Sequence, residues 1–103
     1  YRPAEHTTLR LEPSGPPVGL DRGAVYARSQ LQWKPGDVLF FYTDGVTEAL
    51  LGKGASGGLE EILLKLERGL SAEDLSQRLR SELEKIEEAG GLEDDVTLLT
   101  VSL

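Results

Sequence analysis

The hydrophobic spacing of this chain changes twice along its length, and that change most constrains its fold. Val38 to Thr43 is a strongly apolar run with the length of a strand, and Val96 to Val101 is a second such run. Between them, leucine and isoleucine recur every three or four residues, which is the spacing of amphipathic helices. Strands that precede and follow a pair of helices predict an α+β fold, in which an antiparallel sheet carries a helical hairpin on one face.

Two further segments near the N-terminus also have the pattern of strands. Thr7 to Glu12 alternates polar and apolar side chains, which predicts a half-buried strand. Ala24 to Trp33 is a second alternating run, separated from the first by a turn-rich connection. In Val38 to Thr43 the apolar residues are adjacent rather than alternating, so we expect that strand to be buried on both faces.

The helical part of the chain is bounded by glycines. A glycine-rich loop is predicted from Gly52 to Gly58, and the apolar stripe of the first helix runs from Leu59 to Leu70. The sequence Ser71-Ala72-Glu73-Asp74 is a capping-box pattern, in which the serine hydroxyl accepts a hydrogen bond from a free backbone amide at the helix start. Gly90-Gly91 is predicted to end the second helix.

Composition excludes several classes of site. The 103 residues contain no cysteine and a single histidine, His6, so a disulfide, a thiolate nucleophile, cysteine-bound zinc and a multi-histidine metal site are all excluded. His6 lies outside the acidic motifs described below, and we expect it to be a surface residue. No apolar run approaches the roughly 20 residues of a membrane helix. We therefore expect a cytoplasmic protein without a membrane segment.

The charge is placed unevenly. The net charge is −7, and residues 54–103 carry twelve acids against five bases, whereas residues 1–53 carry six of each. Nucleic acids and anionic membranes are bound by lysine and arginine that neutralise phosphate, so an acidic surface repels both. We expect no nucleic-acid partner.

Acidic residues stand at the ends of both apolar runs. Asp44 follows the first run, and Asp94 and Asp95 precede the second. If the two strands are antiparallel neighbours, these carboxylates meet at one edge of the sheet. Carboxylates gathered in this way repel one another unless a cation lies between them, and an all-oxygen cluster suits Mg²⁺ or Mn²⁺. That arrangement favours phosphate chemistry. The simpler interpretation is an ordinary turn around Asp44 and a solvated acidic pair at the start of the last strand.

A resemblance adds to this pattern. The segment from Lys34 to Ala49, with its Thr-Asp-Gly-Val-Thr-Glu-Ala stretch, closely resembles a signature of the SpoIIE-like bacterial branch of the metal-dependent (PPM, or type-2C) protein phosphatases. Asp94 to Leu99 is similar to the closing motif of that family, and Pro17 to Leu20 is similar to the short segment before the signature. The resemblance extends from about Tyr1 to the C-terminus.

The resemblance implies a β-sandwich of two antiparallel sheets flanked by helices, with two Mn²⁺ or Mg²⁺ ions at one end. Asp44 and Asp94 would be catalytic metal ligands, and Asp95 a neighbouring ligand or a group that orients bound water. Thr43 and Gly45 would shape the backbone around Asp44. A metal-activated water would attack phosphorus directly, without a phospho-enzyme.

The family implies a protein serine/threonine phosphatase that acts in signal transduction on a phosphorylated regulatory protein, such as an anti-sigma-factor antagonist. Its earlier motif, Gly-Asp-Val-x-Gly-His-Gly or similar, supplies the aspartate that bridges both metals, and no such stretch occurs here. We therefore expect residues 1–103 to be the C-terminal portion of a single PPM-type domain, inactive and weakly metal-binding alone. A homodimer or an upstream sensor domain is compatible with this expectation.

Two alternatives remain open. A non-catalytic PPM-like pseudo-phosphatase could bind a regulatory partner protein through its acidic helical half. A purely structural α+β domain would use its acids only for solubility. A haloacid-dehalogenase-type phosphatase is excluded, because the nucleophilic aspartate it requires two positions before Asp44 is Tyr42 here.

Overall fold

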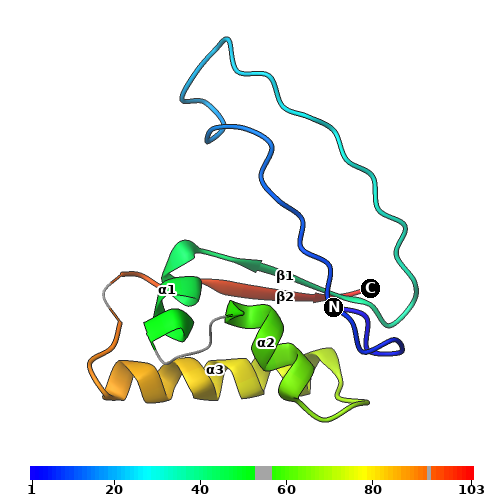
Figure 1. Ribbon diagram of the computed structural model, residues 1–103, viewed down its shortest axis with the longest axis vertical. Coiled ribbons are helices and arrows are strands. Elements are labelled where there is room, and N and C mark those ends of the chain that lie inside the picture. The colour runs from blue at the N-terminus through cyan, green and yellow to red at the C-terminus, as the bar shows by residue number, and fades with distance from the viewer. Residues whose placement is uncertain (53–56, 93) are drawn as a thin grey trace.

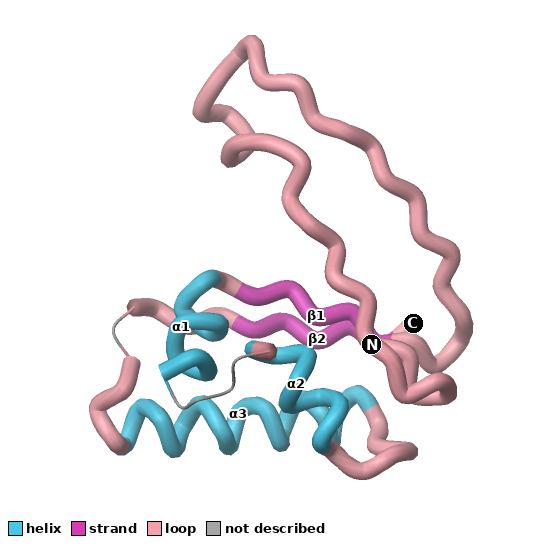
Figure 2. Tube along the Cα trace, viewed as in Figure 1, coloured by secondary structure: helices cyan, strands magenta, loops and turns pink. Residues whose placement is uncertain are grey.

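The structure, a computed structural model, describes residues 1–52, 57–92 and 94–103. Within these residues the chain forms a small α+β unit with helices and strands in the order shown in Figures 1 and 2: β1 (Val38–Tyr42), α1 (Asp44–Gly52), α2 (Gly58–Lys65), α3 (Ala72–Glu88) and β2 (Leu98–Ser102). The predicted glycine-rich loop falls mostly on residues 53–56, which lie outside the described part of the chain.

β1 and β2 pair side by side in antiparallel orientation. The register runs from Val38 opposite Ser102 to Tyr42 opposite Leu98, so the end of β1 adjoins the beginning of β2. Aromatic and branched side chains favour such pleated pairing over a helix. The antiparallel arrangement predicted from the sequence is confirmed, and the segments that carry the two acidic motifs lie at the same edge of the sheet.

The helices pack on one face of this sheet (Figure 1). Val46 and Leu50 of α1 and Leu75 and Leu79 of α3 are almost completely buried. The four-residue spacing within each pair places its members on one face of the helix, so both helices turn an apolar stripe toward the same core. The predicted α+β arrangement, with helices on one side of an antiparallel sheet, is confirmed, but α1 adds a third helix to the predicted hairpin of two. The described residues contain a single two-stranded sheet, so the second sheet implied by the resemblance is not among them.

α3 begins and ends at the predicted residues. The amide of Asp74 donates to the Ser71 hydroxyl oxygen at 3.1 Å, and the Ser71 amide donates to the Asp74 carboxylate at 3.2 Å, which completes the capping box. At the other end the amides of Gly90 and Gly91 donate to the carbonyls of Glu87 and Ile86. Gly90 has a φ of +75°, the left-handed conformation that this closing pair of bonds requires and that glycine adopts without strain.

The N-terminal strand predictions are wrong. Neither Thr7 to Glu12 nor Ala24 to Trp33 forms a strand, apart from one isolated bridge between Arg2 and Thr7. The segment from residue 8 to residue 33 instead forms a long arm that projects away from the sheet (Figure 2). An alternating pattern specifies which side chains face one way, but a strand also needs a neighbour for its backbone amides and carbonyls. The described residues offer this arm no such neighbour.

Two further expectations need correction. β1 is not buried on both faces, because Phe41 is 57% exposed and its partner Leu99 is 55% exposed on the face opposite the helices. The first predicted helix ends at Lys65 rather than near Leu70, since Leu66 already has extended dihedral angles. Leu66 and Leu70 still pack against the core as partly buried residues, which explains why their spacing resembled a longer helix.

The N-terminal residues are tied to the body of the molecule. Tyr1 and Val38 exchange two backbone hydrogen bonds of 2.9 Å across the outer edge of β1. His6, predicted to be a surface residue, is half-buried. Its Nε2 lies 2.9 Å from the Leu64 carbonyl, which can only accept, so Nε2 carries the proton and Nδ1 accepts from the Tyr1 hydroxyl at 3.0 Å.

No helix among the described residues is long and apolar enough to cross a membrane.

Candidate functional site

Asp44 is the first residue of α1, immediately after the turn that leaves β1. Its side chain is exposed, and one of its oxygens accepts a hydrogen bond from the Gly45 amide at 3.0 Å. The helix begins here because the Val46 amide donates to the Thr43 carbonyl. A carboxylate at this position is electrostatically favourable, since the free amides of the first helical turn carry partial positive charge.

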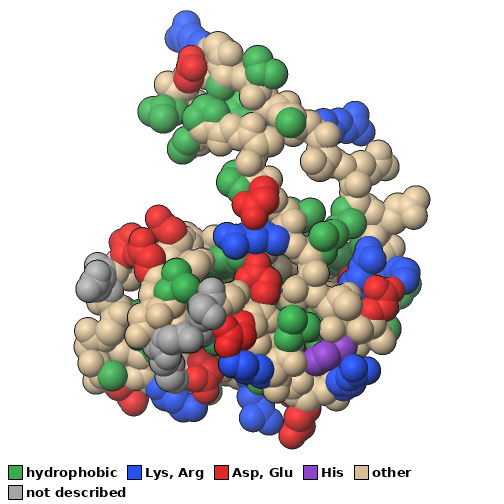
Figure 3. Space-filling view, in the orientation of Figure 1, with side chains coloured by type: hydrophobic (Ala, Val, Ile, Leu, Met, Phe, Trp, Pro, Cys, Tyr) green, Lys and Arg blue, Asp and Glu red, His purple; other side chains and the backbone are tan. Residues whose placement is uncertain are grey.

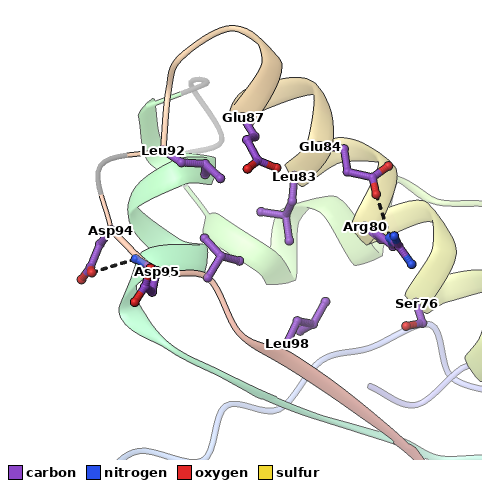
Figure 4. Close-up of a pocket in the computed structure, with 10 residues that line it drawn as sticks. Ser76, Arg80, Leu83, Glu84, Glu87, Leu92, Asp94, Asp95 and Leu98 are labelled. Carbon is purple, nitrogen blue, oxygen red and sulfur yellow. Dashed lines mark hydrogen bonds and ion pairs between the residues drawn. The ribbon is translucent and has the colours of Figure 1, made fainter.

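Asp94 and Asp95 lie in the segment that leads into β2, and both are exposed. The Asp95 amide donates to an Asp94 carboxylate oxygen at 2.7 Å, so Asp94 folds back on its own backbone (Figure 4). The neighbouring Glu93 lies outside the described residues.

Thr43 ties the two acidic segments together. Its hydroxyl donates to the Asp95 carbonyl at 3.3 Å and accepts from the Thr97 amide at 3.1 Å. The Thr43 amide in turn donates to the Thr97 carbonyl at 3.1 Å, which continues the strand pairing by one residue beyond Tyr42 and Leu98. One side chain therefore fixes the position of the segment before Asp44 relative to the segment that contains Asp95.

Gly45 permits a close approach between the same two segments. A Cβ atom at this position would lie 2.4 Å from the Asp95 carbonyl oxygen, far inside van der Waals contact. The residue is buried against that backbone, so a side chain of any size would push α1 away from the Asp95 segment. Glycine is thus required here by space rather than by its dihedral angles.

The structure therefore brings the two acidic segments to one edge of the sheet through their backbones. It does not bring three of their carboxylates into one cluster: among the described residues, no three histidine, cysteine, aspartate or glutamate side chains gather closely enough to hold a metal ion. The predicted ligands Asp44, Asp94 and Asp95 are instead three exposed carboxylates at neighbouring positions.

Sequence reasoning missed two features, one at the opposite end of β1 and one beside the acidic segments. Asp37 is 8% exposed, accepts from the Lys34 amide at 2.9 Å and pairs with Arg2, so it anchors the turn before β1. The second feature is a groove between α3 and the Asp94–Leu98 segment. Helical periodicity could have indicated it, because Arg80, Leu83 and Glu87 recur at the spacing of one helix face.

Comparison with known proteins decides the family. The sequence profile of the family described as Stage II sporulation protein E (SpoIIE) matches residues 1–103, the whole chain. The chain belongs to the SpoIIE family. This membership confirms the resemblance found in the sequence and indicates a phosphatase-like domain with a role in signal transduction.

One curated relative of this SpoIIE-family chain is Protein IcfG from Synechocystis sp., which is 29% identical over 93 residues. The match covers 89% of the chain but 15% of IcfG, so the chain spans a small part of that relative. No solved structure matches the chain.

Proposed function

We propose that this chain is the C-terminal part of a metal-dependent protein serine/threonine phosphatase, a phosphoric monoester hydrolase. The observation that carries the proposal is the junction made by Thr43 and Gly45, which holds the Asp44 and Asp95 segments against each other in a chain of the SpoIIE family. A purely structural role would not require acids on both sides of so closely packed a junction.

The residues at this edge fit a hard divalent cation in chemistry. Asp44, Asp94 and Asp95 offer exposed carboxylate oxygens, the donors that Mn²⁺ and Mg²⁺ prefer. When bound, such ions supply a nucleophilic water and offset the charge of phosphoryl oxygens. In this proposal Asp44, at the start of α1, and Asp94 are metal ligands, and Asp95 is a neighbouring ligand or orients bound water. Thr43 and Gly45 keep the two segments in register.

Three carboxylates are few for two closely spaced ions, so the remaining ligands are expected from outside residues 1–103. Exposed surfaces support the same conclusion. The arm of residues 8–33 carries apolar side chains with no cover, and the outer face of the sheet exposes Phe41 and Leu99. Among the described residues, no strand pairs with the outer edge of β1 beyond Val38, which pairs with Tyr1. That edge is therefore open to a further antiparallel strand. Residues 1–103 are therefore proposed to be the C-terminal portion of a single PPM-type domain.

The test compares the isolated chain with the full-length natural protein that carries it. We expect the full-length protein to hydrolyse a chromogenic phosphate ester in Mn²⁺, and Asp44→Asn to lower both the rate and the Mn²⁺ affinity measured by calorimetry at least tenfold. Asp21→Asn, the same change in the exposed arm, serves as the control. Unchanged Mn²⁺ affinity in Asp44→Asn would overturn the metal assignment, and robust turnover by the isolated chain would overturn its status as a part of a domain.

The proposed substrate is a phosphoserine or phosphothreonine on a small cytoplasmic regulatory protein, such as an anti-sigma-factor antagonist. The acidic balance of the chain supports a protein partner over a nucleic acid. Incubating a phosphorylated antagonist with the full-length protein and following the loss of phosphate by mass spectrometry tests this. Turnover of the chromogenic ester without loss of phosphate from the antagonist would reject the substrate while keeping the reaction. The proposal also includes a second copy of the chain, in a homodimer, or an upstream sensor domain as a further partner.

A second candidate is a non-catalytic pseudo-phosphatase that binds a regulatory protein. The observation that favours it is the lack of a three-carboxylate cluster in the part of the chain that the structure describes. It predicts that the full-length protein binds its partner equally well with and without Mn²⁺ and never releases phosphate, which the same assays distinguish.

A further inference from the structure

The groove between α3 and the segment that leads into β2 has an apolar floor and an acidic rim (Figure 4). Leu83, Leu92 and Leu98 point into it from both walls, and Val96 also lines it. Leu83 is 9% exposed and belongs to the core, whereas the other three are partly buried residues packed against that core. The floor is therefore formed by apolar side chains that pack against the core.

Among the described residues, the rim carries four carboxylates and one guanidinium. Arg80 is already paired, because its Nε lies 2.7 Å from Glu84. Glu87, Asp94 and Asp95 have no basic partner among the described residues, and the Asp94 carboxylate accepts only from the Asp95 amide. The groove thus has an uncompensated negative charge next to apolar surface, which complements a segment that is both basic and apolar.

The length of the groove suits an extended peptide. Ser76 and Glu87 line its two ends along α3, and eleven residues of helix span about 16 Å. An extended chain rises by about 3.3 Å per residue, so the groove accommodates roughly five residues. Asp94 and Asp95, the candidate metal ligands, lie across the groove from α3, toward the end lined by Glu87 (Figure 4).

We propose that this groove binds an extended basic segment of the phosphoprotein substrate, next to its phosphorylated residue. The inference rests on the proposed function and adds a substrate preference to it. The phosphorylated residue lies beside Asp94 and Asp95, while lysine or arginine side chains of the flanking residues face Glu87 on the opposite wall and apolar side chains cover Leu83 and Leu98. Glu87 is not among the candidate metal ligands, so its charge acts on the residues that flank the phosphorylation site.

The test measures binding of fluorescent peptides to the full-length natural protein by anisotropy, at low salt and with EDTA present. One peptide carries two lysines and a leucine, and its matched partner carries glutamines in place of the lysines. We expect the basic peptide to bind at least tenfold more tightly and to lose this advantage as salt is raised. Glu87→Lys should reduce the preference for the lysine peptide by about five- to tenfold. The substitution removes the attraction between Glu87 and a peptide lysine and adds a repulsion between two lysines, each of the size typical of an exposed charge pair.

Glu88→Lys is the matched control. It makes the same charge change one residue further along α3, at an exposed position that does not line the groove, and should leave the peptide preference within twofold. Equal binding of both peptides, or an equal effect of Glu87→Lys and Glu88→Lys, overturns the proposal. Concentration-dependent dimerisation that blocks peptide binding also overturns it, because a second copy of the chain would then be the occupant.

Binding without metal separates this inference from the proposed function. Preference for the basic peptide in a protein that never releases phosphate would keep the groove and reject the phosphatase. Phosphatase activity with no preference between phosphopeptides that differ only in flanking charge would keep the phosphatase and reject the groove.

Discussion

At the scale of single residues, the geometry of the candidate site depends on two small residues rather than on the acids themselves. Gly45 permits contact between α1 and the Asp95 backbone, and Thr43 supplies two hydrogen bonds across the same junction. Both residues were singled out by their place in the motif. Their contacts could not be predicted from the sequence, because Thr43 and Gly45 touch residues about fifty positions away that only the strand pairing brings close.

Replacing Gly45 should show the strain directly. In Gly45→Ala the added Cβ would meet the Asp95 carbonyl at 2.4 Å, so the backbone of one segment must move. We expect a loss of about 1–3 kcal/mol in the free energy of unfolding, typical of an oversized side chain in a packed site. Gly52→Ala, at a helical position where a Cβ meets nothing within 4 Å, should be neutral or stabilising. Urea denaturation measures both variants, and equal effects would contradict the steric argument.

The hydroxyl of Thr43 can be tested with two substitutions of different chemistry. Thr43→Val keeps the shape of the side chain but leaves the Thr97 amide without its 3.1 Å acceptor. We expect a cost of roughly 1 kcal/mol in unfolding free energy and faster hydrogen exchange at the Thr97 amide. Thr43→Ser keeps the hydroxyl and should retain most of the protection. Exchange measured by NMR would reject the assignment if valine and serine behaved alike.

At the scale of elements, the sequence predicted correctly those helix ends that are fixed by hydrogen bonds between residues close together in the chain. The start of α3 at Ser71 and its end at Gly90 follow from hydrogen bonds within a few residues, and both were readable from the sequence. β1 and β2 were predicted correctly because they pair with each other inside the chain. The arm, residues 8–33, has the alternating pattern of strands but no partner strand among the described residues. The pattern alone therefore led to two predicted strands that are not observed.

The capping box gives α3 a measurable dependence on Ser71. In Ser71→Ala the Asp74 amide loses the hydroxyl that accepts from it at 3.1 Å. We expect the variant to lose about 0.5–2 kcal/mol of unfolding free energy, the usual cost of removing such a cap. Ser76→Ala, a serine inside the same helix, should change the stability much less, since alanine is the better helix former. Thermal or urea unfolding followed by circular dichroism checks the pair.

Asp74 makes the same cap sensitive to pH. Hydrogen bonds from the Ser71 hydroxyl and amide lower the pKa of Asp74 from the ordinary value of 3.8. Since the folded state prefers the carboxylate, its stabilising effect is complete above pH 3.8 and is lost as the pH falls through the lowered pKa. The stability difference between the natural chain and Asp74→Ala should therefore be constant near neutral pH and shrink on acidification below about pH 4. A difference that grew on acidification would contradict this assignment.

At the scale of the whole molecule, the exposure of the arm is the feature that packing of the helices and the sheet does not explain. Figure 3 shows hydrophobic side chains gathered along it, and its members are strongly exposed, among them Val18 at 91%, Leu20 at 76% and Val25 at 86%. Uncovered apolar surface of this extent marks an interface in a soluble protein. Strand-like alternation in the same segments is what a sheet partner would use, so the pattern and the exposure agree in pointing to further strands of the proposed larger domain.

Substitutions in the arm should therefore have different effects in the isolated chain and in the full-length natural protein. In the isolated chain Val25→Asn replaces an exposed side chain and should change the unfolding free energy by less than about 0.5 kcal/mol. In the full-length protein, where we expect Val25 to be covered, the same change should cost about 1–3 kcal/mol and lower phosphatase activity. Arg22→Gln, at an exposed polar position of the same arm, should be neutral in both. Equal, small effects of Val25→Asn in both forms would show that the arm remains uncovered and would contradict the assignment of residues 1–103 to part of a larger domain.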